Sequence, residues 1–137
     1  MIHTRIRPCC LLGVCLAALS TAPAPHEEKP RRDDLAEVRY KAALKQFDEV
    51  WVFYRQSRTD SFPVYYWSRL IVDSQRDLSA AKPDRIAALE AHRDRMMKLH
   101  ALVRKVRRLG FGFSTDVGAT EYYRLEAELW LERAKAS

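Results

Sequence analysis

Apolar side chains recur at alternating steps of four and three residues through most of this chain, and this spacing constrains the fold more than any other feature. The first series contains Ala36, Tyr40, Ala43, Phe47, Val50 and Tyr54. Similar series occupy residues 64–81 and 89–106. Steps that alternate between three and four keep side chains on one face of an α-helix. No segment shows the signals of a β-strand, so the sequence predicts an all-α fold.

Proline, glycine and polar residues divide this pattern into four segments. A polar stretch precedes Pro63, Pro83 follows the second series, and Gly110 begins the last turn. Proline suits the first turn of a helix, and glycine commonly follows a helix end. We therefore predict helices at about 33–58, 62–81, 84–109 and 116–135. Short connections make consecutive helices antiparallel. Two antiparallel helical hairpins result, packed as a four-helix bundle or as an elongated, coiled-coil-like hairpin pair.

Residues with side-chain oxygens stand near each predicted helix start and are expected to cap it. The candidates are Asp33 or Asp34, Asp60 or Ser61, Asp84, and the run Ser114 to Asp116.

The last predicted helix carries two neighbouring apolar stripes. One stripe contains Tyr122, Leu125 and Leu129, and the other contains Tyr123, Ala127, Trp130 and Ala134. Together they make a broad apolar face that a single helix could not sustain in water. We expect the three preceding helices to cover it.

The first twenty residues follow the three-part pattern of a secretory signal peptide. A basic start precedes an uncharged apolar run at residues 9–19, and Ala18 and Ser20 supply small residues for a cleavage site. The run is shorter than the roughly 20 residues that span a bilayer. We predict export to the periplasm or cell envelope, with cleavage near Ser20. An uncleaved anchor is the alternative.

Beyond the signal peptide the chain has room for one domain. The predicted organisation is a signal peptide at 1–20, a flexible Pro-rich and charged tether at 21–32, and a helical domain at 33–137. All three cysteines lie in the signal peptide, so the mature domain has no thiol for a disulfide, a zinc site or catalysis. The net charge of +6 is spread among interspersed acidic and basic residues, so no nucleic-acid partner is expected.

Metal-ligating residue types occur together only in the third predicted helix. His92, Met96 and His100 are four residues apart and therefore lie on one helix face. Imidazole and thioether ligands suit copper. The two histidines are about 12 Å apart along a straight helix, so an ion would need a neighbouring pair and ligands from another helix. The alternative is that these side chains pack in the core, where methionine often fills gaps.

No grouping of residues predicts catalysis or a cofactor. The carboxylates of the last helix share it with Arg124 and Arg133 and form a solvated face with ion pairs. The chain has no glycine-rich phosphate loop and no Ser-His-Asp order. We therefore expect a protein that is not an enzyme. The basic run Arg104 to Arg108 either contacts anionic lipid headgroups weakly or lies in solvent at a helix C-terminus.

Clustered aromatic residues favour an interaction role. Consecutive helical residues are rotated by about 100°, so adjacent rings cannot all face one core. The candidate interface residues are Tyr65, Tyr66, Trp67, Phe111, Phe113, Tyr122 and Tyr123. Exposed aromatic clusters often mark interfaces, although rings also cover the ends of bundles.

These observations predict a non-catalytic exported protein that acts through helix-mediated protein contacts in the cell envelope, with another protein or with itself. The alternative function is a periplasmic metal-responsive or metal-buffering protein that uses His92, Met96 or His100.

The second hairpin contains Gly110, Ser114, the pair Asp116-Val117, Ala119 and the run from Tyr123 to Glu128. This order is similar to the turn and helix of the periplasmic hairpins in TolC-type outer-membrane efflux channels. The resemblance covers roughly 30 residues, and Arg107 stands where that family has a tyrosine. It implies an exported helical hairpin. It does not imply a channel, because nothing here supplies a barrel's strands. The same run resembles segments of other exported bacterial helical proteins.

Overall fold

Four helices make up the computed structural model, which describes residues 31–137. They are α1 (Arg32–Arg55), α2 (Phe62–Leu78), α3 (Lys82–Arg108) and α4 (Asp116–Ala136). No strand occurs within residues 31–137. The all-α prediction is confirmed, and each predicted boundary agrees to within three residues. The predicted signal peptide and nearly all of the predicted tether lie outside the described residues.

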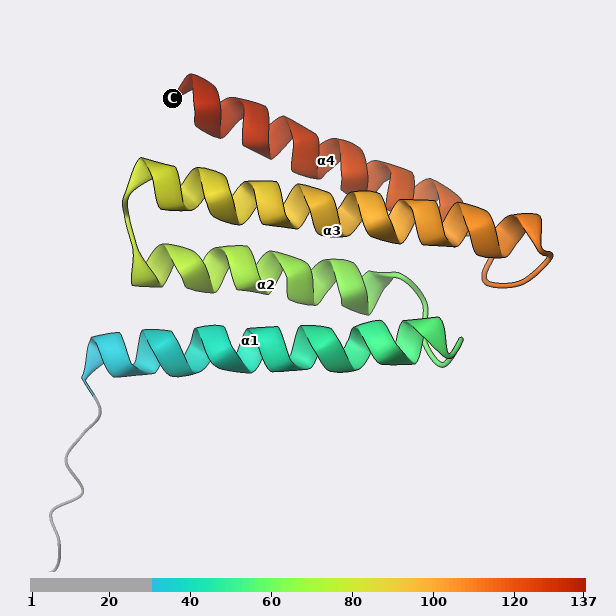
Figure 1. Cartoon of the computed structure of the whole chain (residues 1–137), viewed down its shortest axis with the longest axis horizontal. Coiled ribbons are helices and arrows are strands. Elements are labelled where there is room, and N and C mark those ends of the chain that lie inside the picture. The colour runs from blue at the N-terminus through green and yellow to red at the C-terminus, as the bar shows by residue number, and fades with distance from the viewer. Residues whose placement is uncertain (1–30) are drawn as a thin grey trace, which may run out of the picture.

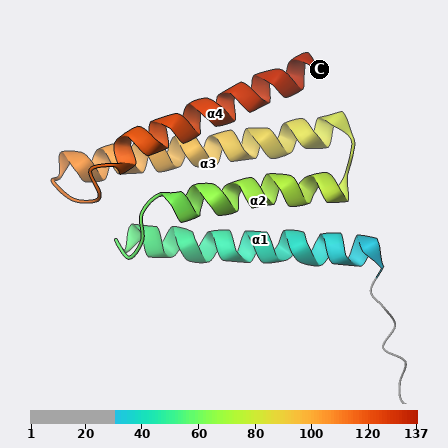
Figure 2. The same ribbon diagram turned by 180° about the vertical axis from the view of Figure 1, so that it is seen from behind.

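Consecutive helices lie side by side and run antiparallel, as Figures 1 and 2 show from opposite sides. α1 packs against α2, α2 against α3, and α3 against α4. The α1–α2 and α3–α4 turns therefore lie at the same end of the molecule (Figure 1). We call this the double-turn end and define it as residues 53–62 and 104–115. The α2–α3 turn and the C-terminus lie at the opposite end.

Helix ends follow from local backbone preferences. α1 stops at Arg55, three residues earlier than predicted, because Ser57 adopts a positive φ of 56° that no helix continues. α2 stops at Leu78 because the backbone of Ser79 is extended. The Ser79 hydroxyl accepts a hydrogen bond from the amide of Ala81 at 3.2 Å. After α3, Gly110 takes a φ of 83°, the left-handed conformation typical of a residue that follows a helix.

The predicted capping role holds for Asp60, whose side chain accepts the first amide of α2, and the other predicted roles were wrong in detail. The N-cap positions are Arg31, Ser61, Ala81 and Thr115, and none of them caps its own helix through its side chain. Asp34 instead accepts a hydrogen bond from the amide of Arg31 at 3.3 Å. Asp60 accepts one from the amide of Phe62 at 3.0 Å. The Ser61 hydroxyl is engaged with another helix, as described below.

The core lies along the predicted seams. Its main cluster draws on all four helices and contains Val50, Val64, Tyr65, Met96, Leu99, Val103 and Ala127. A second cluster, away from the double-turn end, contains Val72, Leu89, Leu131 and Ala134. Leu78, at the end of the α2 seam, is an exception because it is exposed. Since the main cluster involves every helix, the two hairpins form one bundle.

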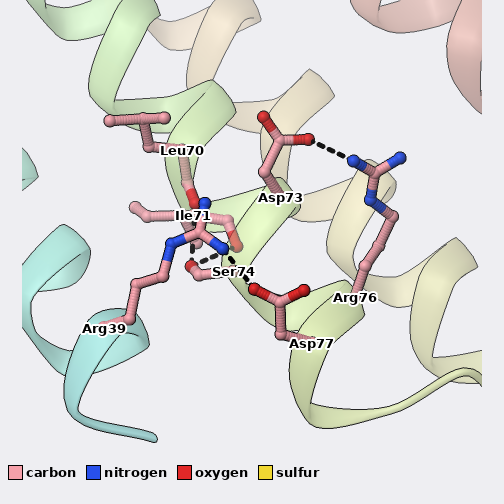
Figure 3. A network of polar contacts seen from close by, with 7 residues as sticks. All are labelled: Arg39, Leu70, Ile71, Asp73, Ser74, Arg76 and Asp77. Atoms are coloured by element: carbon pink, nitrogen blue, oxygen red, sulfur yellow. Dashed lines mark hydrogen bonds and ion pairs between the residues drawn. The ribbon is translucent and has the colours of Figure 1, made fainter. Parts of the chain in front are cut away.

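One polar contact from α2 to α1 and several within α2 lie close together (Figure 3). Arg39 of α1 forms an ion pair with Asp77 of α2. Ser74 is fully buried, and its hydroxyl donates to the carbonyl oxygens of Leu70 and Ile71 at 2.8 and 3.0 Å. A serine can therefore lie in the apolar seam of α2 without an unpaired hydroxyl.

Within residues 31–137, no helix is both long enough and apolar enough to cross a membrane.

Candidate functional site

The clearest apolar surface that no other helix covers is a stripe along the outside of α4. Tyr122, Leu125 and Leu129 are 60%, 49% and 48% exposed. The opposite face of the helix is buried, with Ala127 and Leu131 at 0% and 1%. α4 lies at one edge of the bundle, packed mainly against α3 (Figure 1). The expectation that the rest of the chain covers both stripes was therefore wrong. We call Tyr122, Leu125 and Leu129 the outer stripe.

The seven aromatic candidates divide into two groups. Tyr65 is buried, and Trp67 and Tyr123 pack against the main core cluster. The other four are exposed: Tyr66, Phe111, Phe113 and Tyr122. Of these four, Phe111 and Phe113 lie at the double-turn end, Tyr122 lies on the outer stripe, and Tyr66 lies on α2 outside both surfaces.

Tyr65 and Tyr123 join the two hairpins. Their rings are stacked, with centroids 4.0 Å apart and an interplanar angle of 9°. The Tyr65 hydroxyl donates to the carboxylate of Glu126, which also accepts from the Tyr122 hydroxyl at 3.1 Å. Burial and then the hydrogen bond to Glu126 raise the pKa of Tyr65 to about 12, so it stays protonated at neutral pH. This arrangement fixes α4 on α2 and holds Tyr122 in place on the outer stripe.

A second polar cluster is buried in the middle of the bundle. The Nδ1 atom of His92 is 2.8 Å from the hydroxyl of Ser68, which also accepts a hydrogen bond from Arg95 Nε at 2.7 Å. Because the serine proton is free to donate to Nδ1, the imidazole proton is assigned to Nε2. No partner for Nε2 occurs among the described residues. Burial, followed by the charges of Arg95 and Arg69, lowers the pKa of His92 to about 3.

This cluster is structural in character. Ser68 and His92 are both 0% exposed, so no substrate can reach the hydroxyl. The guanidinium carbon of Arg95 lies 5.5 Å from the centre of the Phe47 ring, and the His92 ring stacks on Trp130 at 5.7 Å. The partly buried cation is therefore held by an aromatic face and a serine, and the neutral imidazole packs as an aromatic ring.

The three metal-ligand candidates do lie along one face of α3, but they have separate neighbours. Met96 lies in the main core cluster. The Nδ1 atom of His100 is 3.1 Å from the hydroxyl of Thr120 on α4, whereas His92 pairs with Ser68 on α2. Residues 31–137 contain no group of three or more His, Cys, Asp and Glu side chains that could hold a metal ion. The metal-binding role of His92, Met96 and His100 stays a prediction.

At the double-turn end, Asp116 ties three helices together. It is the first residue of α4 and is 4% exposed. Its Oδ1 accepts hydrogen bonds from the amide and hydroxyl of Ser61 at 3.3 and 2.8 Å, and its Oδ2 accepts a longer one from the Tyr54 hydroxyl at 3.4 Å. Burial and the Asp116 carboxylate raise the pKa of Tyr54. A pocket of about 240 Å³ lies beside this group, with Leu102, Val106 and Phe113 among its walls.

The sequence analysis did not predict the polar group around Asp116 or the one around Ser68. It assigned Ser61 and Asp116 to helix capping, and it did not consider Ser68 or Arg95. Ser68 falls outside the 3–4 series of α2, and its distance from His92 in the sequence carries no signal. The local hint that this hydroxyl faces inward is its spacing from two seam residues, four after Val64 and three before Ile71.

Comparisons of the chain with protein-family models, curated proteins and solved structures give no match. The resemblance of the second hairpin to TolC-type channels accordingly stays a prediction.

Proposed function

We propose that this is a non-catalytic, exported helical protein that acts through helix-mediated contact in the cell envelope, and that the outer stripe of α4 is its contact surface. The observation that carries the proposal is the exposure of three large apolar side chains on one face of a helix whose opposite face is buried.

The spacing of the outer stripe suits another helix. Tyr122, Leu125 and Leu129 follow steps of three and four, the repeat by which two helices interlock their side chains. They cover about 10 Å along the helix axis at 1.5 Å per residue. A partner helix laid along α4 would remove all three from water, which is the main driving force for helix association.

The charges on α4 favour a second copy of the same chain in antiparallel orientation. Among its exposed charges, Glu121 lies near the start of α4, and Arg133 and Lys135 lie in its last turn, where Lys135 also pairs with Glu132. Two antiparallel α4 helices would bring Glu121 of each toward the basic last turn of the other. Their helix dipoles would also be opposed, which is the favourable arrangement. Self-association is therefore the first contact to test.

Site-specific photo-cross-linking in cells tests the contact surface. A photo-activatable phenylalanine analogue replaces Leu125 in one strain and Lys98, an exposed α3 residue, in the other. We expect a covalent dimer of the chain from position 125 and none from position 98. Equal cross-linking from both positions, or none from position 125, would remove the outer stripe as the contact surface.

Export is tested separately, by fractionation and mass spectrometry of the expressed protein. The signal pattern predicts a mature N-terminus near Thr21 and recovery outside the cytoplasm. Recovery of a soluble cytoplasmic chain that retains Met1 would contradict the envelope location. A dimer cross-linked from position 125 would then be a contact made in the cytoplasm.

A further inference from the structure

A second surface, distinct from the outer stripe, lies at the double-turn end. The α3–α4 turn reads Leu-Gly-Phe-Gly-Phe over residues 109–113. Leu109, Phe111 and Phe113 are 64%, 68% and 48% exposed. In the neighbouring α1–α2 connection, Phe53 and Phe62 are exposed as well. Apolar side chains from both turns therefore lie in water at one end of the molecule.

The α3–α4 turn is held in a defined conformation. The amides of Gly110 and Phe111 donate to the carbonyl oxygens of Arg107 and Val106 at 3.0 and 3.1 Å. The guanidinium of Arg107 donates to the carbonyl oxygen of Gly112 at 3.2 Å. Gly112 has a φ of 77°, and an added Cβ would approach Val106 to 3.1 Å. The exposure of Phe111 and Phe113 is thus a consequence of a fixed turn.

Six cations lie in the same two segments of the chain as these apolar side chains. They are Arg55, Arg58, Arg104, Lys105, Arg107 and Arg108. Within residues 31–137, none of the six forms an ion pair with a carboxylate. The double-turn end contains one acidic residue, the exposed Asp60, and the adjacent Asp116 is buried. The double-turn end therefore has a strong excess of positive charge.

We propose that the double-turn end docks on the surface of an anionic lipid bilayer. Such a surface offers an apolar interior to the side chains at the tip and negative headgroups to the cations around them. A polyanion such as nucleic acid would match the cations but would leave Leu109 and the phenylalanines largely in water. The docking surface lies at the end of the bundle and the outer stripe along its side, so one contact does not exclude the other.

Hydrogen–deuterium exchange of the full chain locates the lipid contact. The protein is mixed with vesicles of phosphatidylcholine alone, or with vesicles in which phosphatidylglycerol replaces part of it. We expect slower exchange of the amides in residues 104–113 with phosphatidylglycerol present. Protection confined to residues outside the double-turn end would overturn the proposal.

Vesicle co-sedimentation measures the contribution of each group. The double variant Phe111→Ser with Phe113→Ser should bind about tenfold more weakly, because burial of apolar rings is lost. The variant Arg104→Gln with Arg108→Gln should also bind more weakly and respond less to added salt. Two matched controls should bind like the unmodified chain: Leu35→Ser with Val38→Ser, which removes exposed apolar side chains of α1, and Lys41→Gln with Lys45→Gln. Unchanged binding of the phenylalanine variant would contradict docking by this end.

Acyl-chain contact separates a bilayer from other anionic partners. In a Phe111→Trp variant, lipids brominated on their acyl chains should quench additional tryptophan emission relative to the unmodified chain. Absence of this quenching, together with equal binding to double-stranded DNA at the same salt concentration, would show a general polyanion surface and overturn the proposal.

Discussion

At the scale of single residues, the buried polar side chains set the relative positions of the helices. Asp116 joins the ends of α1, α2 and α4 through Tyr54 and Ser61. Ser68 joins α2 to α3 by pairing with both His92 and Arg95. Because an unpaired buried polar group is costly, these contacts favour one register of the helices over others.

The buried imidazole predicts a dependence of stability on pH. The folded pKa of His92, about 3, lies below its ordinary value of 6.5. Between these values the unfolded chain binds a proton that the folded chain does not, so the free energy of unfolding falls as pH falls from 6.5 toward 3. We expect a loss of about 1 kcal/mol between pH 7 and pH 5.5, measured by urea unfolding.

The matched control is His92→Gln, which has no titrating ring at this position. Its stability is lower throughout, but it should vary less over the same pH interval. The pKa of His100 is also lowered, by partial burial and then by Arg124 and Arg104, so a smaller dependence should persist. A variant with the full pH dependence of the unmodified protein would show that His92 is not its source.

At the scale of elements, the spacing of apolar residues was sufficient to predict the four helices and most of the core. The seams of α1 and α3 were recovered, with His92 and Met96 inside them. The covered face of α4 could not be predicted, because both of its adjacent stripes are apolar. Only the edge position of α4 decides which stripe is buried. Hydrogen bonds between helices, such as that of Ser61 with Asp116, could not be predicted either, because residues 55 positions apart share no local sequence pattern.

Truncation on the two faces of α4 should change stability by different amounts. Leu131→Ala removes a side chain that is 1% exposed and should destabilise the fold by about 2 to 4 kcal/mol. Leu129→Ala removes one that is 48% exposed and should change stability by about 0.5 kcal/mol or less. Urea unfolding at low protein concentration compares the two without a contribution from association. Similar losses for both variants would contradict the assignment of inner and outer faces.

At the scale of the whole molecule, the bundle presents two different surfaces. Its side carries the outer stripe, which is apolar with mixed charges nearby, and its double-turn end carries exposed aromatic rings within a basic surround. The bundle has its own core, so neither surface is required for folding. This separation of core from exposed surface is what the proposed contact function requires.

Light scattering of the full chain over a concentration series tests the central claim most directly. The outer stripe predicts that the mean mass rises from that of one chain toward that of two. The Leu125→Ser and Leu129→Ser double variant should stay at the mass of one chain under the same conditions, with an unchanged helical circular dichroism spectrum. A single-chain mass for the unmodified protein at every concentration, or equal association of the variant, would contradict self-association through α4.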